Sequence, residues 1–267
     1  MTSPIPAIPL PISKFMEELA RIGQGVLFLD YDGTLAPFTP DREHAYPYPD
    51  AIRLLKAIRA NGRTRLVLVS GRPAKDVQRL LGLEPAPEIW GVHGLERLLP
   101  SGEYRRQLLS TRQTEGLIEA RSWIESQGLQ AHMEVKPGSL AFHWRGLRED
   151  AIEELRARIE LLWQPFTRGN DLCLKAFDGG IELRVCATDK GDAVRRVISE
   201  TSGSVPMAYL GDDWTDEDGF RALAGCGLTI LVRSEHRPTL ATAWLTPPEQ
   251  LVDFLAEWLR ACGGNDE

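Results

Sequence analysis

The 267-residue sequence has few cysteines, no excess of basic residues and no long uncharged hydrophobic segment. The four cysteines, Cys173, Cys186, Cys226 and Cys262, are widely separated and form no CxxC pair. This spacing argues against a disulfide framework and against a structural zinc site. It favours a reducing, cytoplasmic environment.

Charge and hydropathy exclude two further classes of protein. The net charge is −7, whereas nucleic-acid-binding surfaces are basic, so we expect no nucleic-acid partner. The longest uncharged apolar segment, residues 222–232, is much shorter than the ~20 residues of a membrane-spanning helix. Residues 1–15 carry no basic head and contain four prolines, so we expect neither a signal peptide nor a helix there.

What is present is a regular alternation of strand-like and helix-like segments. Short β-branched or leucine-rich segments predict strands at residues 25–30, 64–71, 88–94, 206–213 and 228–232. Helical periodicity or capping predicts helices at residues 47–62, 72–83, 215–225 and 247–264. This alternation predicts an α/β fold, a Rossmann-like parallel sheet with helices on both faces. Ligands of such sheets bind at the carboxyl ends of the strands.

The middle of the chain has a different pattern of elements. Residues 114–128 and 149–163 predict helices, and residues 130–146 and 171–185 predict β-hairpins, the second with Asp178-Gly179 as its turn. Helix, hairpin, helix, hairpin describes a smaller α+β module inserted into the α/β chain. We therefore expect a core of residues 1–103 and 184–267 and an inserted domain of residues 104–183.

Polar residues follow several strands of the predicted core. They are Asp30 and Asp32 after the first strand, Ser70, Gly71 and Arg72 after the second, and Asp212 and Asp213 after the fourth, while Lys190 begins a helix. Each has a local alternative, since Asp-Gly pairs make turns and Asp189 or Thr215 can cap a helix. Together, however, two pairs of acids at one sheet edge repel unless a cation joins them. Oxygen ligands suit Mg²⁺, and a nearby serine and lysine suit a phosphate.

This set resembles the haloacid dehalogenase superfamily of phosphatases. The DxDGT sequence from Asp30, then Ser70, Lys190 and the Gly-Asp-Asp at residues 211–213, occur in that family's order. The resemblance implies that Asp30 is the nucleophile and forms an aspartyl-phosphate, and that Asp32 is the general acid and base. It also implies that Ser70 and Lys190 hold the phosphoryl oxygens. Mg²⁺ would be bound by the Asp30 carboxylate, the Asp32 main-chain carbonyl and Asp212, with Asp213 close by.

The first hairpin of the inserted domain predicts a polar face. With Pro137-Gly138 as a two-residue turn, Lys136 lies opposite Ser139, Glu134 opposite Ala141 and His132 opposite His143. One face then carries His132, Glu134, Lys136, His143 and Arg145, and the other carries Met133, Val135, Leu140, Phe142 and Trp144. The apolar face is expected to cover the two helices of the inserted domain. The polar face is either merely solvated or, with its mixture of donors and acceptors, a binding surface for a polyol. In the second case we expect Glu182 to belong to the same surface.

The resemblance narrows to trehalose-6-phosphate phosphatases. The matching segments are Asp-Tyr-Asp-Gly-Thr-Leu from Asp30, Gly-x-His-Gly-x-Glu from Gly91, Glu-x-Lys from Glu134, His-x-Arg from His143, Glu-x-Arg from Glu182, Asp-Lys-Gly from Asp189 and Gly-Asp-Asp-x-Thr-Asp-Glu from Gly211. The sequence departs from this family at Val185, where proline is usual, and at Gly219, where alanine is common. In this family the inserted domain is a cap that selects the substrate.

The resemblance implies substrate-binding roles for a defined set of residues. Glu134, Lys136, Arg145 and Glu182 would contact the sugar, and Gly71, Arg72 and His143 complete the expected substrate-binding set. His93 either holds the substrate loop or is a structural histidine. The cap is expected to hinge near Tyr104 and Leu183.

These expectations define one leading function and several alternatives. The leading one is Mg²⁺-dependent hydrolysis of trehalose 6-phosphate, with a small-molecule sugar phosphate as the partner. The alternatives are a phosphatase of the same type acting on sucrose phosphate or mannosyl-3-phosphoglycerate, and a non-catalytic sugar-phosphate sensor. The sequence does not determine the oligomeric state, and a monomer is compatible with it.

Overall fold

The computed structural model describes residues 10–39, 41–144 and 147–265. Within them the larger sheet has eight strands in the order β12-β11-β10-β1-β2-β3-β4-β5. The strands are β1 (Gly25–Leu29), β2 (Thr64–Val69), β3 (Glu88–Gly91), β4 (Glu96–Leu98), β5 (Tyr104–Arg106), β10 (Met207–Gly211), β11 (Leu228–Val232) and β12 (Ala243–Leu245). Pairing is parallel from β12 to β3 and antiparallel from β3 to β5.

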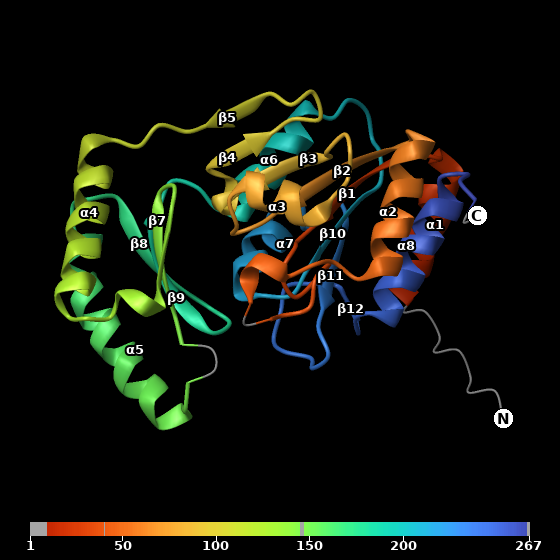
Figure 1. Cartoon of the computed structure of the whole chain (residues 1–267). Coiled ribbons are helices and arrows are strands. Elements are labelled where there is room, and N and C mark those ends of the chain that lie inside the picture. Colours follow the sequence, from red (N-terminus) through yellow and green to blue (C-terminus); the bar gives the residue numbers. More distant parts are fainter. Residues whose placement is uncertain (1–9, 40, 145–146, 266–267) are drawn as a thin grey trace.

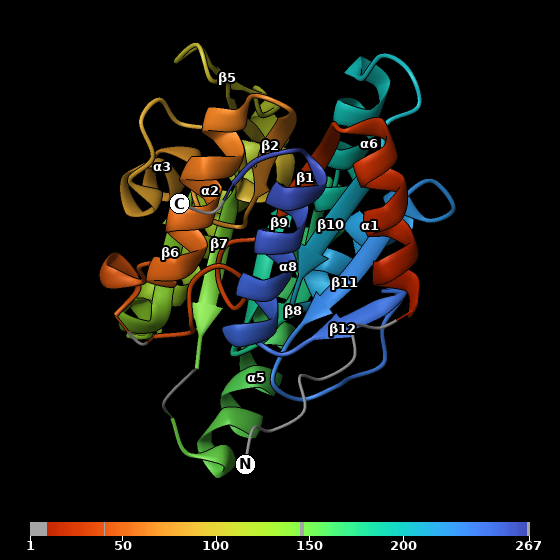
Figure 2. The ribbon, with the colours of Figure 1, turned by 90° about the vertical axis from the view of Figure 1, so that its right-hand side faces the viewer.

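Helices cover both faces of this sheet. They are α1 (Leu10–Ile22), α2 (Pro49–Asn61), α3 (Ala74–Leu81), α6 (Lys190–Glu200), α7 (Glu217–Leu223) and α8 (Glu249–Ala261). Figure 2 looks onto the side where α1, α2 and α8 lie in front of the strands. One hydrophobic cluster lies beneath these three helices and α3, and a second lies beneath α6 and α7. The predicted parallel sheet with helices on both faces is confirmed.

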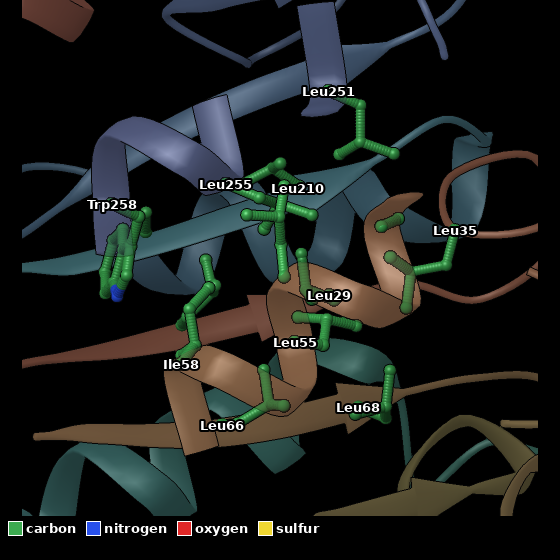
Figure 3. Packing of buried hydrophobic residues seen from close by; sticks show 14 of the residues in the cluster. Leu29, Leu35, Leu55, Ile58, Leu66, Leu68, Leu210, Leu251, Leu255 and Trp258 are labelled. Carbon is green, nitrogen blue, oxygen red and sulfur yellow. The ribbon is translucent and has the colours of Figure 1, made fainter. Parts of the chain in front are cut away.

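The larger of the two clusters fixes β1 and its neighbours in the middle of the core. Leu29, Leu55 and Leu255 converge there from β1, α2 and α8, with Trp258 at the end of the cluster (Figure 3). Each fully buried leucine contributes about 2 kcal/mol from the removal of its side chain from water. The strand ends that carry the acids are therefore held on a rigid base.

The expectation of no helix in the first 15 residues is wrong. Helix α1 begins at Leu10, with Pro11 in its first turn, where a proline is tolerated because the amide has no partner within the helix. Ile12, Phe15 and Leu19 recur at helical spacing and are buried against the core. The prolines obscured this periodicity. Strands β4, β5 and β12, of three residues each, were also too short to be predicted.

A second, smaller sheet forms the inserted domain, which we call the cap. Its strands pair antiparallel in the order β6-β7-β9-β8. They are β6 (Met133–Lys136), β7 (Ser139–His143), β8 (Leu172–Phe177) and β9 (Gly180–Val185). Helices α4 (Thr111–Ser126) and α5 (Glu149–Trp163) cover one face of the cap sheet, and the other face is turned toward the core (Figure 1).

The sheet pairings refine the expected domain boundaries. Tyr104 belongs to β5, which pairs with β4 in the core sheet. Leu183 lies in the middle of β9 and is paired on both sides, with Leu140 and Leu174. Leu183 is held by two neighbouring strands and Tyr104 by one. The hinge expected near these residues therefore falls in the adjoining connections and stays a prediction. The division into core and cap remains a prediction, with its connections at residues 107–110 and 186–189.

The register of the first cap hairpin agrees with the prediction in the strands and departs from it at two positions. Lys136 pairs with Ser139 and Glu134 with Ala141. His132, however, lies in the short 3₁₀ helix Gln130–His132, and its ring packs 5.8 Å from that of Phe142, so it does not face His143. Val135 is 52% exposed instead of covering the helices, because β6 is the edge strand.

The second cap hairpin brings two cysteines together. Cys173 at the start of β8 and Cys186 just after β9 form a disulfide with a Cα–Cα separation of 5.2 Å. The expectation of a cysteine set without disulfides is wrong for this pair, because antiparallel pairing joins residues that are distant in the sequence. Among the described residues, no helix is long and apolar enough to cross a membrane.

Candidate active site

Three adjacent strands and one helix bring the predicted polar residues to one edge of the core sheet. Asp30 follows β1, Ser70 follows β2 and Asp212 follows β10, and these strands are neighbours. Lys190 is the first residue of α6, whose start is capped by Asp189. Its ammonium lies 2.8 Å from Asp30 Oδ1. The convergence predicted from the sequence is therefore present.

Lys190 lies between two buried carboxylates. Its Nζ is 2.8 Å from both Asp30 Oδ1 and Asp216 Oδ1, and all three residues are buried. Burial opposes its charge, but the two carboxylates raise the pKa of Lys190 above its ordinary value, so the ammonium stays charged. Burial and the charge of Asp216 raise the pKa of Asp30 to about 7, although Lys190 opposes that rise. A further cation here would favour the ionised Asp30.

Asp216 anchors the loop that follows β10. Its Oδ1 accepts hydrogen bonds from Lys190 Nζ and the Tyr209 hydroxyl, and its Oδ2 accepts them from the amides of Asp212 and Asp213. This residue was not among the predicted site residues. The alternative in which Thr215 caps a helix is not found, because the capping box here is formed by Asp213 and Asp216. An acid three residues after Asp213 was the available signal.

The acidic residues fit a hard divalent cation. Oxygen atoms of Asp30, Asp212 and Asp216 lie within 4.8 Å of one another, and neither carboxylate oxygen of buried Asp212 has a hydrogen-bond partner among the described residues. Burial and the charge of Asp30 raise the pKa of Asp212 well above its usual range. An unpaired buried carboxylate is costly, and an all-oxygen donor set suits Mg²⁺. Because the four hydrogen bonds to Asp216 already occupy its carboxylate, Asp30 and Asp212 are the better ligands.

Glycine is required where the backbone approaches this cluster. Gly33 has a φ of +80°, and a Cβ there would lie 2.3 Å from Asp212 Oδ2. Asp213, by contrast, is not part of the cluster. Its carboxylate accepts hydrogen bonds from the amides of Trp214 and Asp178, the second of which belongs to the cap. Asp213 therefore joins the core loop to the turn between β8 and β9.

Asp32 is paired with Arg72 at the wall of the site. Arg72 donates from Nε and Nη2 to the two carboxylate oxygens of Asp32, each over 2.7 Å. The Arg72 Nη1 donates to the main-chain carbonyl of Arg42 over 2.8 Å. Ser70 Oγ accepts from the amide of Arg72, which fixes the loop after β2. Gly71 passes so close to His93 that a Cβ there would lie 2.7 Å from the imidazole Cε1.

Glu182 is the centre of a buried polar network on the cap sheet. Its Oε1 accepts from Lys136 Nζ over 3.0 Å and from Ser139 Oγ over 2.7 Å. Its Oε2 lies 2.9 Å from His93 Nε2, which comes from the core. Burial opposes the charge of Glu182, but Lys136 and His93 hold its pKa well below the usual range, so it is a carboxylate. Burial lowers the pKa of Lys136.

His93 connects the core to the cap. It lies after β3 with a φ of 53°, and its amide donates to the Ser70 carbonyl. Burial lowers the pKa of His93 to about 4, so the imidazole is neutral and Nε2–H donates to Glu182. These contacts join the loop after β2 to the cap, and the choice between the two predicted roles of His93 stays a prediction.

A second connection joins the exposed end of the cap face to the core. Glu134 forms an ion pair with Arg42, and His143 Nε2 lies 2.9 Å from the same Glu134 oxygen. Arg42 belongs to the 3₁₀ helix Arg42–His44 and was missed by the sequence analysis, because no motif includes it. Arg145, predicted for the same face, lies outside the described residues.

These groups surround a cavity between core and cap. It is lined from the core by Asp30, Asp32, Ser70, Gly71, Arg72, His93, Lys190 and Arg42, and from the cap by Lys136, His143, Phe177 and Asp178. The predicted catalytic residues and part of the predicted sugar-binding face therefore border one space. Glu134 and Glu182 are joined to that lining through Arg42, Lys136, His143 and His93.

The parallel sheet, its acidic strand ends and the inserted cap form a haloacid dehalogenase-like fold. The Trehalose-phosphatase family model matches residues 28–244. The chain therefore belongs to the trehalose-phosphatase family.

The chain is also similar to several individual proteins. A trehalose-phosphate phosphatase of Mycobacterium bovis is 31% identical over 89% of the chain and 62% of its own length. An uncharacterized glycosyl hydrolase of Mycobacterium tuberculosis is 31% identical over 93% of the chain but only 19% of its own length. The structure of the C-terminal domain of C. albicans trehalose-6-phosphate phosphatase has a TM-score of 0.80 at 22% identity, covering 98% of this chain and 99% of that one. The chain spans less than two thirds of the length of the two mycobacterial relatives.

Proposed function

We propose that this protein is a Mg²⁺-dependent phosphatase that hydrolyses trehalose 6-phosphate to trehalose and phosphate. The observation that carries the proposal is a single cavity bordered by both the Asp30–Lys190 pair and the polar face of the cap. The first supplies a nucleophile beside a fixed positive charge. The second supplies donors and acceptors for sugar hydroxyls. Membership of the trehalose-phosphatase family supports this choice of sugar.

The proposed reaction has two steps, transfer of the phosphoryl group to Asp30 and hydrolysis of the resulting aspartyl-phosphate. A carboxylate oxygen of Asp30 forms a bond to phosphorus while the bond between phosphorus and the sugar oxygen breaks, and Asp32 donates a proton to that oxygen. Asp32 then takes a proton from water, whose oxygen attacks phosphorus and releases phosphate and the Asp30 carboxylate. Two moderate barriers replace one high barrier. Lys190 and Ser70 hold the phosphoryl oxygens.

Charge balance explains the residues around Asp30. A carboxylate and a phosphate dianion repel, and Lys190 offsets part of that repulsion from a buried position. Mg²⁺ held by Asp30, Asp212 and the Asp32 main-chain carbonyl would supply the remaining positive charge. Asp216 keeps Lys190 and the loop of Asp212 in place through its four hydrogen bonds.

The ion pair between Arg72 and Asp32 has a consequence for the acid role. The Arg72 guanidinium donates a hydrogen bond to each carboxylate oxygen of Asp32, so the carboxyl group is directed at Arg72. Asp32 therefore has to exchange Arg72 for the leaving sugar oxygen before it donates a proton. This exchange fits a site that is completed when the substrate enters.

The proposal also assigns the sugar end and the movement of the cap. Glu134 and Glu182 would accept hydrogen bonds from sugar hydroxyls, and Lys136, His143 and Arg145 would donate to them. Substrate entry requires the cap to move, and we place the hinge at residues 107–110 and 186–189. A charged sugar-phosphate substrate favours a cytoplasmic location, whereas the Cys173–Cys186 disulfide is more typical of an oxidising compartment.

A phosphate-release panel tests the proposal. Trehalose 6-phosphate, sucrose 6-phosphate and mannosyl-3-phosphoglycerate are compared with and without Mg²⁺. We expect trehalose 6-phosphate to be hydrolysed much faster than the other two sugars. Phosphate release should stop when Mg²⁺ is removed by EDTA and resume when Mg²⁺ is restored. Equal rates on all three sugars contradict the assigned substrate. Tight binding of trehalose 6-phosphate without turnover identifies a sensor.

A further inference from the structure

Arg42 is a core residue whose side chain reaches across to the cap. It lies in the 3₁₀ helix Arg42–His44, between β1 and α2. Its guanidinium forms an ion pair with Glu134 of β6, and its Nη1 lies 3.1 Å from His143 Nε2 of β7. It also lines the cavity described above. Arg42 is therefore a core contribution to the polar face of the cap.

The contact determines how Glu134 is presented to the cavity. One oxygen of Glu134, Oε2, is shared by Arg42, His143 at 2.9 Å and Lys136 at 3.8 Å. The side chains of Arg42 and Glu134 are about equally exposed, at 31% and 28%. Arg42 lines the cavity, and Glu134 lies directly behind it. A planar guanidinium fixes a carboxylate by direction as well as by charge. Removing Arg42 leaves Glu134 without its main orienting partner.

The main chain of Arg42 faces the reacting end of the site. Its carbonyl accepts a hydrogen bond from Arg72 Nη1, and Arg72 holds both oxygens of Asp32. One residue thus contacts the sugar-binding face through its side chain and the partner of the proposed acid through its backbone. A side-chain substitution changes the first contact and retains the second.

We propose that Arg42 is a specificity-determining residue, which orients Glu134 and His143 and donates hydrogen bonds to the part of the sugar remote from the phosphate. This inference rests on the proposed function. Sugar recognition is then shared between core and cap and is complete only when the cap lies over the turn of Arg42. Substrates without a sugar make no use of this contact.

The chain offers a matched control on the same turn. Arg79 of α3 pairs with Glu43, the residue after Arg42, and their side chains are 49% and 73% exposed. This pair does not line the cavity. Arg79→Ala therefore removes an arginine contact to the same 3₁₀ helix without changing the proposed binding face.

The experiment compares two substrates across a small set of variants. kcat/KM is measured on trehalose 6-phosphate and on p-nitrophenyl phosphate for the wild type, Arg42→Ala, Arg42→Lys and Arg79→Ala. Losing a charged hydrogen bond in a binding site typically costs about tenfold to a hundredfold. We expect Arg42→Ala to lose that much on trehalose 6-phosphate, and about tenfold more than it loses on p-nitrophenyl phosphate. Arg42→Lys should recover part of the loss, and Arg79→Ala should match the wild type on both substrates.

A second measurement tests the coupling to Glu134. If Arg42 acts by orienting Glu134, then Arg42→Ala combined with Glu134→Gln should lose little more than the worse single variant. Additive losses overturn that route. Equal losses on both substrates, or no loss, overturn the specificity role. Wild-type turnover tests the proposed function separately. If the wild type prefers another sugar phosphate of the panel, that sugar replaces trehalose 6-phosphate in the comparison with p-nitrophenyl phosphate. Should Arg42→Ala not fold, Arg42→Lys and Glu134→Gln supply the same ratio.

Discussion

Core and cap each bury a lysine against carboxylates, but they build the arrangement in different ways. In the core, Lys190 lies between Asp30 and Asp216, which come from a strand end and a short 3₁₀ helix. In the cap, Lys136 meets Glu182 across the face of a sheet. At strand ends and helix starts the backbone holds each side chain in a defined position, which suits a reaction at a single atom. A sheet face carries alternate side chains, which suits recognition of many hydroxyls.

The two regions also differ in charge balance. In the core, both carboxylate oxygens of buried Asp212 lack a hydrogen-bond partner in the part of the chain that the structure describes. In the cap, Glu182 has Lys136, Ser139 and His93 as partners. The core is thus electrostatically incomplete without a cation, whereas the cap network is satisfied by the protein itself. This contrast favours the Asp30 end of the cavity, and not the cap end, as the place of the proposed cation.

The largest expected effect is on the chemistry of the core. Asp30→Asn replaces the proposed nucleophile with a group that cannot form the acyl-phosphate, so kcat should fall by about 10⁴-fold or more. Phosphate release measures this loss, and thermal melting checks that the variant is folded. Asp50→Asn, which removes an exposed carboxylate at the start of α2, is the control and should retain activity. Turnover by Asp30→Asn near the wild-type rate would refute the nucleophile assignment.

Exchanging the two buried lysines for methionine compares the regions directly. Lys190→Met leaves Asp30 and Asp216 without their cation and should reduce the free energy of unfolding by about 3–5 kcal/mol. Lys136→Met should cost about 1–2 kcal/mol, because Glu182 retains Ser139 and His93. Urea denaturation in EDTA measures both. A larger loss for Lys136→Met would reverse the contrast between core and cap.

The disulfide should stabilise the cap. Cys173 and Cys186 are 13 residues apart, and closing a loop of this size contributes about 3 kcal/mol in the chain-entropy account. We expect dithiothreitol to lower the melting temperature of the wild type and to leave that of Cys173→Ser/Cys186→Ser unchanged. Mass spectrometry with thiol alkylation shows whether the bond is present. Identical melting with and without reductant contradicts a stabilising disulfide.

His93 should make stability depend on pH at the junction of the two regions. Its folded pKa of about 4 lies below its ordinary 6.5, so between these values the unfolded chain binds a proton that the folded chain does not. Stability is lost as the pH falls through this window, by about 2 kcal/mol from pH 7 to pH 5. His93→Gln should show a correspondingly weaker loss, whereas exposed His236→Gln should behave like the wild type. Parallel curves for all three proteins count against a buried neutral His93.

The smallest expected effect is the stabilisation by Mg²⁺. At a Mg²⁺ concentration ten times the dissociation constant, binding adds about 1.4 kcal/mol to the free energy of unfolding. The melting temperature should rise with Mg²⁺ in the wild type and not in Asp212→Asn. Lys136→Met should keep the full response, because the proposed metal ligands all belong to the core. A Mg²⁺ response lost in Lys136→Met and retained in Asp212→Asn would place the cation at the wrong end of the cavity.

Local patterns were sufficient for most of the core and for the cap hairpin. Strand and helix periodicity predicted the parallel sheet, and Pro137-Gly138 predicted the register of Lys136 with Ser139. These features are encoded by neighbours in the sequence. The first helix was missed because Pro11 conceals a helical pattern that the core nevertheless buries. Arg42 and Asp216 were missed because their roles come from residues of other elements.

The sequence by itself determined the motif residues and their order: Asp30 and Asp32 after one strand, Ser70 after the next, and Lys190 and Asp212 far along the chain. Tertiary structure alone decided their partners. In the folded chain Lys190 forms an ion pair with Asp216, and the Asp213 carboxylate accepts a hydrogen bond from the cap. Cys173 forms a disulfide with Cys186, and Arg42 forms an ion pair with Glu134. The physical reason is that secondary structure depends on local periodicity and turn chemistry, whereas buried charges take whichever partner the packing of distant elements brings within reach.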